Sequence, residues 1–462
     1  MQNVEIINLP YQQSAEDLFA SIRHLPDAIW LDAGRPAYSS SQFDIITASP
    51  SVVLETRGKE TQIITTQSTT ISSENPFDLC EQLFLSLKKT GLHYDDYPFI
   101  GGLAGYFGYD LGQPMRDQPP KLDSLPDMRI GHYQWALVLD HFSKKSWLFF
   151  NADCLSSLRK EVIKCISNKS QDIYKKEKNI YRNFISTTKK DCYMSAIAKV
   201  KNYILAGDCY QVNYAQHFSA EFKADNWELY KELRRSLPAP YSCYYQLGDS
   251  KQAILSFSPE RFIKLDGNKV ETKPIKGTIR RGVTEKDDIL QITKLINSKK
   301  DKAENLMIVD LLRNDLGKSC IPGSIQTPRL FEIESFENVH HLVSTITGLI
   351  RKNETPISLL RRCFPGGSIT GAPKKRAMEI IDELESCKRS VYCGSIGYIS
   401  ITGKMDTSIA IRTLISDGER LHCWGGGGIV ADSNAADEYQ EIFDKISLLI
   451  KSNTIQETNN RP

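Results

Sequence analysis

Glu271-Thr-Lys-Pro-Ile-Lys-Gly-Thr278 is the stretch around which the rest of the chain is organised. A strand-like run at residues 261–265 precedes it, and Asp266-Gly267-Asn268 separates the two as a tight-turn signal, because Gly and Asn tolerate positive φ. The pattern predicts a β-hairpin. Counting outward from its turn brings Glu260 and Lys276 to within about two residues of opposite register. A carboxylate and an amine would then face each other at the open end of the hairpin.

Two interpretations of the Glu260–Lys276 pair are open at this point. Pro274 has no N–H to donate, so regular pairing is expected to loosen there, and Gly277 lets a ligand approach the backbone. These features favour a functional pair. The alternative is a solvated surface ion pair, which contributes little to stability. The rest of the chain has to decide between them.

The composition is that of a globular protein with balanced charge. The chain has 462 residues, of which 40% are hydrophobic and 25% charged, and its formal net charge is +2. This balance gives no electrostatic case for a nucleic acid or a membrane surface as partner, and no apolar run is long enough to span a bilayer. The 11 cysteines are scattered without a C-x-x-C pair, and no signal-peptide pattern is visible. We therefore expect reduced thiols and a cytoplasmic protein.

Changes in composition divide the chain into four expected parts. Residues 1–165 mix strand-like runs with a helical pattern and are expected to form an N-terminal α/β part. Residues 166–190 are rich in Lys and Arg and are interpreted as a charged linker. Residues 191–451 form the larger part, and residues 452–462 an expected disordered tail. The glycine-rich run at residues 99–109 fits neither a dinucleotide fingerprint nor a P-loop, which favours a closely packed strand or bend.

Three glutamates lie on or beside the apolar stripes of two expected helices. Glu304 shares a stripe with apolar residues, while Glu438 and Glu441 are three apart on a helix from about residue 433 to 450. A carboxylate on an apolar stripe is costly to bury unless a cation or donor meets it. Three glutamates with open positions suit Mg²⁺, which takes few protein carboxylates and keeps several waters. Surface acids paired with lysines are the alternative.

Other segments suit an anionic ligand. Gly367-Ser-Ile-Thr-Gly-Ala-Pro373 precedes a helix whose free N–H groups suit an anion, with ordinary capping as the alternative. Residues 407–414 are expected to form one strand that carries small residues and Arg412 on one face, so that the guanidinium reaches into a cavity to bind a carboxylate. Trp424-Gly-Gly-Gly-Gly-Ile429 leaves its backbone open to a ligand. Together these segments favour a small ligand with several carboxylates, although a carbohydrate or cofactor is not excluded by them.

The order of these motifs resembles one known family. The matching segments are Ser258-Pro-Glu-Arg-Phe262, Pro274-Ile-Lys-Gly-Thr278, Glu304-Asn-Leu-Met-Ile-Val-Asp310, His341-Leu-Val-Ser344, Gly367-Ser-Ile-Thr-Gly-Ala-Pro373, Asp406-Thr407 through Arg412, and Gly428-Ile-Val-Ala-Asp-Ser433, with a weaker match at Gly105-Tyr-Phe-Gly-Tyr-Asp-Leu111. The chain is similar there to the chorismate-utilising enzymes. The resemblance implies an α+β fold in which two large antiparallel β-sheets pack face to face as a sandwich, with helices on the outside and the site in the cleft. Residues 191–451 would then be the chorismate-binding catalytic domain.

The resemblance also implies roles for individual residues. Lys276 and Glu260 become the candidate catalytic residues. Glu304, Glu438 and Glu441 match the positions that hold Mg²⁺ at the ring carboxylate of chorismate. The residues implied to line the substrate site are Gln211, Gly277, Thr278, His341, Tyr392, Arg412, Gly426 and Gly428.

Two positions discriminate among the reactions of the family. Members that add water carry a lysine where this chain has Gln211, so Gln211 indicates ammonia as the nucleophile. Members that form anthranilate typically carry alanine at the position of Lys276. Lys276 therefore indicates amination of chorismate to 4-amino-4-deoxychorismate, on the way to 4-aminobenzoate and folate, through a covalent adduct on this lysine. Anthranilate formation is the alternative, and an inactive chorismate or tryptophan sensor is a third, disfavoured by the retained acids and Arg412.

A source of ammonia is also implied. The chain shows no G-x-C-x-G elbow, and hence no glutaminase triad of its own. The resemblance implies that a separate class I glutamine amidotransferase subunit supplies ammonia. Pro240-Tyr241-Ser242 resembles a region that forms a tryptophan pocket in relatives, but the rest of that motif departs from the feedback-sensitive pattern.

Overall fold

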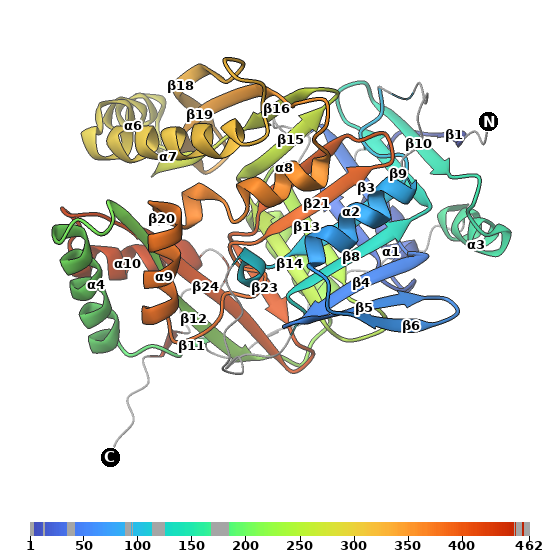
Figure 1. Ribbon diagram of the computed structural model, residues 1–462, viewed down its shortest axis with the longest axis horizontal. Coiled ribbons are helices and arrows are strands. Elements are labelled where there is room, and N and C mark those ends of the chain that lie inside the picture. Colours follow the sequence, from blue (N-terminus) through green and yellow to red (C-terminus); the bar gives the residue numbers. More distant parts are fainter. Residues whose placement is uncertain are drawn as a thin grey trace.

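Two large β-sheets with helices around them make up the protein (Figure 1). The structure is a computed structural model and describes residues 4–12, 14–34, 42–87, 94, 96–112, 125–167, 184–447, 449 and 455–456. Among these residues all strand pairings are antiparallel except that of β11 with β25. The predicted α+β sandwich of antiparallel sheets with helices outside is confirmed.

The first sheet has 13 strands in the described residues. In spatial order they are β1 (Glu5–Leu9), β10 (Lys145–Phe150), β9 (Trp135–Asp140), β3 (Phe43–Thr47), β2 (Ile29–Asp32), β13 (Tyr241–Gln246), β14 (Ala253–Ser258), β23 (Thr413–Ser416), β24 (Arg420–Ile429), β12 (Gln211–Glu221), β11 (Phe184–Ser186) and β25 (Ile455–Gln456), with β20 (Gly371–Ala372) beside β12. Strands from both ends of the chain thus share one sheet.

The second sheet has 12 strands within the same described ranges. In spatial order they are β17 (Ile275–Arg280), β19 (Val339–Leu349), β16 (Lys269–Thr272), β15 (Arg261–Asp266), β22 (Met405–Ile409), β21 (Ser395–Ser400), β7 (Gly102–Phe107), β8 (Met128–Tyr133), β4 (Val52–Arg57), β5 (Glu60–Thr65) and β6 (Thr69–Ser72), with β18 (Gln326–Ser335) beside β19. The glycine-rich run at residues 99–109 contains β7, as its interpretation as a packed strand predicts.

Helices cover the outer faces of both sheets. Those that bury residues against the first sheet are α1 (Glu16–Ile22), α3 (Ser156–Ser167), α4 (Lys190–Leu205), α5 (Asn226–Ser236), α9 (Lys374–Leu384) and α10 (Ala435–Ile446). Those on the side of the second sheet are α2 (Pro76–Leu87), α6 (Glu285–Asn297), α7 (Lys299–Gly317) and α8 (Pro356–Cys363), together with the short helices η1 (Tyr109–Gly112) and η2 (Gly367–Ile369). Among the described residues no helix is long and apolar enough to cross a membrane.

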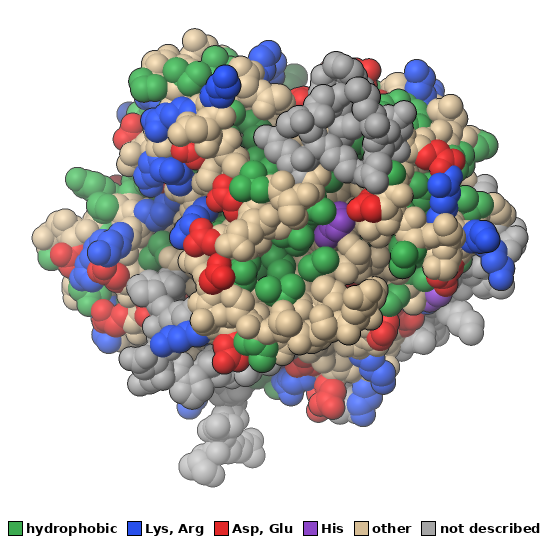
Figure 2. Space-filling view, turned by 45° about the vertical axis from the view of Figure 1, so that its right-hand side comes forward, with side chains coloured by type: hydrophobic (Ala, Val, Ile, Leu, Met, Phe, Trp, Pro, Cys, Tyr) green, Lys and Arg blue, Asp and Glu red, His purple; other side chains and the backbone are tan. Residues whose placement is uncertain are grey.

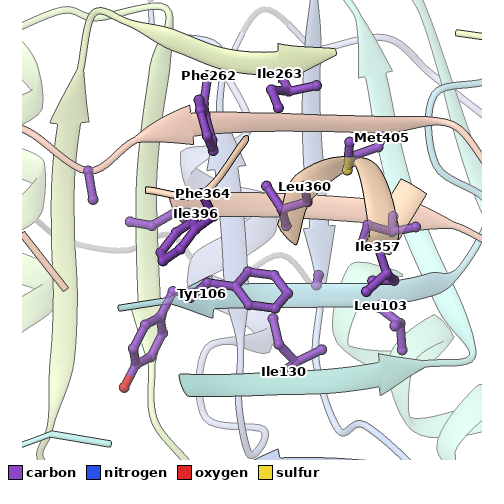
Figure 3. Packing of buried hydrophobic residues seen from close by; sticks show 14 of the residues in the cluster. Leu103, Tyr106, Ile130, Phe262, Ile263, Ile357, Leu360, Phe364, Ile396 and Met405 are labelled. Carbon is purple, nitrogen blue, oxygen red and sulfur yellow. The ribbon is translucent and has the colours of Figure 1, made fainter. Parts of the chain in front are cut away.

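The hydrophobic core has two layers. One lies between the sheets and continues under α2, α7 and α8, and it joins Ile29 and Val138 of the first sheet to Leu103 and Ile130 of the second. Figure 3 shows Ile357 and Leu360 of α8 close to the strands of the second sheet. The other layer lies between the first sheet and its helices. Lys, Arg, Asp and Glu side chains intersperse on the face seen in Figure 2, in keeping with the balanced net charge.

The expected domain division falls partly on residues outside the structure's description. Residues 168–183 of the expected charged linker lie outside the described residues, and so does most of the expected tail. Ile455 and Gln456 of that tail form β25 beside β11. The parts before and after the linker contribute strands to both sheets, so the boundary between them stays a prediction.

The single strand expected over residues 407–414 is wrong. β22 ends at Ile409 in the second sheet, and β23 begins at Thr413 in the first. Arg412, between them, has a φ of 51°. The chain crosses from one sheet to the other at this bend, so Ser408 and Arg412 do not share the face of one strand, although the alternation of small residues continues through the break.

Candidate active site

The predicted hairpin forms, but its ladder is shorter than the sequence suggests. The outermost pair of β15 and β16 is Lys264 with Glu271. Beyond Pro274 the chain continues as β17, which pairs with β19 instead. Glu260 and Lys276 therefore do not face each other across one ladder. They are still close enough for their charges to interact.

Glu260 is a buried carboxyl group held by a neighbouring hydroxyl. It directly precedes β15 and is 5% exposed. Ser368 in η2 donates a hydrogen bond from Oγ to Oε1 of Glu260 over 2.7 Å. Burial raises the pKa of Glu260 to about 7, although the Ser368 hydrogen bond and the Lys276 charge oppose the rise. Such a carboxyl group can both give and take a proton near neutral pH.

Lys276 is a buried amine on β17. Its Nζ lies 3.9 Å from Oε2 of Glu304, and the side chains are 13% and 14% exposed. Burial lowers the pKa of Lys276, Glu304 opposes this effect, and Lys445 adds to it. The net direction favours the neutral amine, which is the nucleophilic form.

Gln211 and Gly428 border this amine from the first sheet. A Cβ atom on Gly428 would lie 2.5 Å from Nε2 of Gln211 and 3.2 Å from Nζ of Lys276, so glycine leaves the room that both side chains occupy. Gln211 is fully buried, and within the described residues neither its Nε2 nor its Oε1 has a hydrogen-bond partner. Because buried polar atoms are nearly always paired, the two unpartnered amide atoms of Gln211 indicate a polar ligand beside Lys276.

The three glutamates predicted to hold a metal lie on α7 and α10 among lysines. Nζ of Lys300 is 3.9 Å from Glu304 and 3.5 Å from Glu438, while Lys445 and Glu441 approach to 2.8 Å. In the part of the chain that is described, no group of three or more His, Cys, Asp or Glu has the arrangement of a metal site. The ammonium group of Lys300 nevertheless pairs with both Glu304 and Glu438, so a positive charge already lies between these two carboxylates.

The donor chemistry of these acids fits a hard divalent ion. Glu438 is 5% exposed and accepts a hydrogen bond from Oγ of Ser433 over 2.7 Å, which fixes its carboxylate. Burial raises the pKa of Glu304, and the Lys276 and Lys300 charges oppose this effect. Only oxygen ligands are present, and these are what Mg²⁺ prefers. The residues therefore fit Mg²⁺ in the place that Lys300 now neutralises.

Arg412 is a partly buried cation at the bend between the sheets. Desolvation lowers its pKa to about 10, and no carboxylate of the described residues opposes this shift. It lies near His341, whose pKa burial lowers to about 3 with a contribution from the Arg412 charge. A partly desolvated guanidinium without a carboxylate is costly, and a carboxylate ligand would relieve that cost.

His341 is tied to the strand that carries Lys276. Thr278 and His341 are opposite each other in β17 and β19, and Oγ1 of Thr278 lies 2.7 Å from Nδ1 of His341. Gly277, between Lys276 and Thr278, has a φ of 86°, and a Cβ there would meet Leu295 of α6 at 3.0 Å. Gly277 thus lets β17 pack closely against the helices.

Tyr392 and Trp424 form an aromatic wall near the glycine run. Their rings stack at a centroid distance of 6.0 Å and an angle of 9°. Nε1 of Trp424 is buried without a hydrogen-bond partner in the described ranges. A Cβ on Gly426 would lie 2.7 Å from the carbonyl oxygen of Tyr214, so this glycine is required by the neighbouring strand. Lys445 donates a hydrogen bond to the Gly426 carbonyl over 2.9 Å.

Four residues of this region were not predicted to act there: Ser368, Lys300, Lys445 and Trp424. The lysines carry a sequence signal, because each is four residues from one of the glutamates. Ser368 lies in a motif that the sequence singles out as an anion site, but its partner is 108 residues away and nothing local indicates it. α9, which follows that motif, begins after Pro373 without a side-chain cap.

A separate cavity of about 480 Å³ contains none of the predicted site residues. Pro240, Tyr241 and Ser242 contribute to its lining, together with Arg261. Arg261 is neutralised there by ion pairs with Glu271 and Asp406. The segment noted for its resemblance to a tryptophan pocket therefore does line a cavity, and the Arg261 charge in that lining is already paired.

Comparison with known proteins identifies the family. Residues 27–451 match the chorismate binding enzymes, and the chain belongs to this family, as its motifs predict. It is 43% identical over 443 residues to aminodeoxychorismate synthase component 1 of Escherichia coli (strain K12), with 95% of this chain and 96% of the relative covered. The same-named protein of Salmonella typhimurium is 43% identical over 460 residues, covering 96% and 97%. Among solved structures, anthranilate synthase component I from Streptococcus pneumoniae TIGR4 superposes with a TM-score of 0.75 at 30% identity, covering 88% of this chain and 92% of that one.

Proposed function

We propose that this chain aminates chorismate at C4 to give 4-amino-4-deoxychorismate, with ammonia as nitrogen source. The observation that carries the proposal is the buried Lys276 amine beside Gly428 and the unpartnered Gln211, with the Glu260 carboxyl group close by. The 43% identity to two relatives named aminodeoxychorismate synthase component 1 supports the same activity. The alternative, anthranilate formation, has weaker support, because the anthranilate synthase compared is 30% identical.

Binding of the substrate uses the Arg412 guanidinium, which lacks a carboxylate partner among the described residues. Chorismate has two carboxylates, one on the ring and one on its enolpyruvyl group. Arg412 would bind the enolpyruvyl carboxylate, with the backbone at Gly426 and Gly428 and the Tyr392 side chain around it. His341, whose lowered pKa keeps it neutral, and Thr278 would flank the ring. Binding is favourable because the substrate carboxylate supplies the anionic partner that the Arg412 guanidinium lacks.

The first chemical step is a displacement by Lys276. Its neutral Nζ forms a bond to C2 of chorismate, the two ring double bonds shift, and the C4–oxygen bond breaks. Glu260, protonated, gives its proton to the departing hydroxyl, which leaves as water. A covalent adduct on Lys276 results, and Glu260 is left ionised.

The second step reverses the shift. Ammonia forms a bond to C4, the double bonds return, and the bond between C2 and Nζ of Lys276 breaks. Glu260 accepts a proton from the incoming nitrogen and is ready for the next cycle. The unpartnered amide of Gln211 is placed to hold ammonia near Lys276 by hydrogen bonding.

Mg²⁺ is proposed as the cofactor. Glu304, Glu438 and Glu441 would hold it against the ring carboxylate, in the place where lysines now neutralise the acids. When bound it supplies charge neutralisation and polarisation of the ring carboxylate.

The ammonia donor is proposed to be a second protein. The two relatives are named as component 1, which implies a second component. We propose that this component is a class I glutamine amidotransferase subunit. The product would feed 4-aminobenzoate and folate synthesis.

Product identification tests the proposal. The purified chain is incubated with chorismate, Mg²⁺ and ammonium, and the products are separated and identified by mass. We expect 4-amino-4-deoxychorismate without release of pyruvate. Fluorescent anthranilate with an equal amount of pyruvate would contradict the proposal and favour the alternative.

A further inference from the structure

We propose that Ser368 is a positioning residue for Glu260: its hydroxyl fixes the carboxyl group at Oε1 and, by donating to it, favours the ionised form. The inference rests on the proposed function, because it assigns the proton transfers of chorismate amination to Glu260. It goes beyond that function by naming a residue that controls the acid and base without reacting itself.

The backbone around Glu260 is fixed on both sides. Oγ of Ser258 donates to the Ile409 carbonyl over 2.6 Å, and the Glu260 N–H donates to the same Oγ over 3.2 Å. The Ile409 N–H in turn donates to the Glu260 carbonyl over 3.1 Å. With its backbone held in this way, Glu260 retains freedom only in its side chain, and the Ser368 hydrogen bond restricts that freedom.

The loop that carries Ser368 is anchored before and after it. Nζ of Lys374 donates to the carbonyl of Pro365 over 2.8 Å, and the guanidinium of Arg389 donates to the carbonyl of Ile369 over 2.9 Å. The Thr370 hydroxyl donates to the Gly366 carbonyl over 3.0 Å. The bonds from Lys374 and Arg389 are charge-assisted, which is the stronger class of hydrogen bond. They fix the loop and, with it, the position of Ser368.

Close packing brings this loop to Glu260. A Cβ on Gly366 would lie 2.6 Å from Cδ1 of Ile409, and one on Gly367 would lie 2.8 Å from Cδ2 of Leu311. Glycines therefore let the loop fit between β22 and α7. The same Cβ on Gly366 would lie 3.4 Å from Cε2 of Phe262, whose ring centroid is 6.4 Å from that of Phe364 (Figure 3). Ser368 is 8% exposed, so no bulk water replaces its hydroxyl.

The hydroxyl acts against burial. Burial favours the neutral carboxyl group, whereas a hydrogen bond from Ser368 stabilises the carboxylate. An acid that must protonate a leaving hydroxyl and then accept a proton from nitrogen needs both states within reach at neutral pH. The Ser368 hydroxyl thus keeps the ionised state of the buried Glu260 carboxyl group accessible.

The pH dependence of activity tests this role. Ser368→Ala removes the donor, and the pKa of Glu260 is expected to rise, because burial then acts with less opposition. Since protonated Glu260 is the active acid in the first step, the fall of kcat/KM for chorismate at high pH should move to higher pH by about one unit. Ser368→Thr keeps a hydroxyl and should restore the wild-type profile. Ser319→Ala is the matched control, since the hydroxyl of this buried serine has no hydrogen-bond partner in the described residues.

A double-variant comparison separates positioning from structure. If Ser368 acts through Glu260, Ser368→Ala should lower kcat by about tenfold in the wild-type background and by less than about twofold in a Glu260→Gln background. Equal losses in both backgrounds, together with an unshifted pH profile, would overturn the inference. Should Ser368→Thr fail to fold, these measurements on Ser368→Ala still decide the question.

The same assay separates this inference from the proposed function. If the wild-type chain makes 4-amino-4-deoxychorismate but Ser368→Ala leaves its pH profile unchanged, only the Ser368 role is contradicted. If the wild-type chain makes another product, the proposed function fails first. Product identity for every variant is therefore measured together with its rate.

Discussion

Two arginines show how differently the chain compensates its charges. Arg389 is 1% exposed, donates hydrogen bonds to Glu385 and to two backbone carbonyls, and packs over the ring of Tyr109 at 4.5 Å. Arg412, on the bend between the sheets, is partly buried, and no carboxylate of the described residues offsets the desolvation that lowers its pKa. The first arginine is satisfied by the chain itself, whereas the second lacks an anion.

The same contrast separates two buried lysines. Lys374 donates to Asp315 and to the carbonyls of Cys363 and Pro365, which accounts for its three N–H bonds. Within the described residues, the ion pair of Lys276 is the long one with Glu304 at 3.9 Å, and burial lowers the pKa of the amine although Glu304 and Glu260 oppose this effect. Lys374 and Arg389 therefore stabilise the loop that carries Ser368. Lys276 and Arg412 have charges that the chain compensates less well, as expected of groups that bind a ligand.

The largest effect is expected at Lys276. Lys276→Ala should lower amination of chorismate by about 10³-fold or more, because it removes the nucleophile. The free energy of unfolding, measured with urea, should change by less than about 1 kcal/mol, since a poorly compensated buried amine is lost. A variant that keeps more than about a tenth of wild-type activity would contradict the assignment.

Arg389→Met is expected to act on stability. It leaves Glu385 buried without its partner, which should lower the free energy of unfolding by about 3–5 kcal/mol. Urea denaturation followed by circular dichroism measures the loss. A change below about 1 kcal/mol would mean that the two arginine regions do not differ as described.

Arg412→Met should show the opposite pattern, with little effect on stability and a large effect on activity. Without a carboxylate to lose, the chain should be as stable as the wild type within about 1 kcal/mol, or slightly more stable. The value of kcat/KM for chorismate should fall by about 100-fold, mostly through KM, since a charge-assisted pair with a substrate carboxylate is lost. Marked destabilisation with unchanged KM would place Arg412 among the structural arginines.

The smallest effect is expected at Gln211. Gln211→Leu replaces two unpartnered polar atoms by an apolar group of similar size, which should raise the free energy of unfolding by about 1 kcal/mol. The KM for ammonium should rise at the same time, because the amide no longer holds the nitrogen. If stability falls instead, the amide has a partner in the folded protein and the site is less open than described.

Local patterns were enough to predict much of the fold. The turn at Gly267 predicted the β15–β16 hairpin, and apolar periodicity predicted α7 and α10. Of the two acids expected at the margin of α10, Glu441 is exposed, whereas Glu438 is buried. The ordered motifs identified the sandwich and the family. These signals are short in range or depend on the order of motifs, and neither needs the packing of distant segments.

Long-range pairing could not be predicted in the same way. Small residues alternate along the sequence up to Arg412 without a break, so the sequence gives no sign that the chain changes sheets there. The change is visible only in the backbone bend at Arg412. β16 pairs with both β15 and β19, and after the interruption at Pro274 the chain leaves β15 and continues along β19 as β17. The Ser368–Glu260 bond depends on a loop fixed by Lys374 and Arg389, and no sequence spacing reports that contact.

The role of Lys276 as nucleophile is tested most directly by mass spectrometry of the intact chain. The chain is incubated with chorismate and Mg²⁺ without ammonium, quenched with acid, and digested to locate any modification. We expect an adduct with the mass of chorismate less one water on the peptide that contains Lys276, absent in Lys276→Ala and released by ammonium. An adduct on another residue, or one formed at the wild-type rate in Lys276→Ala, would contradict this role.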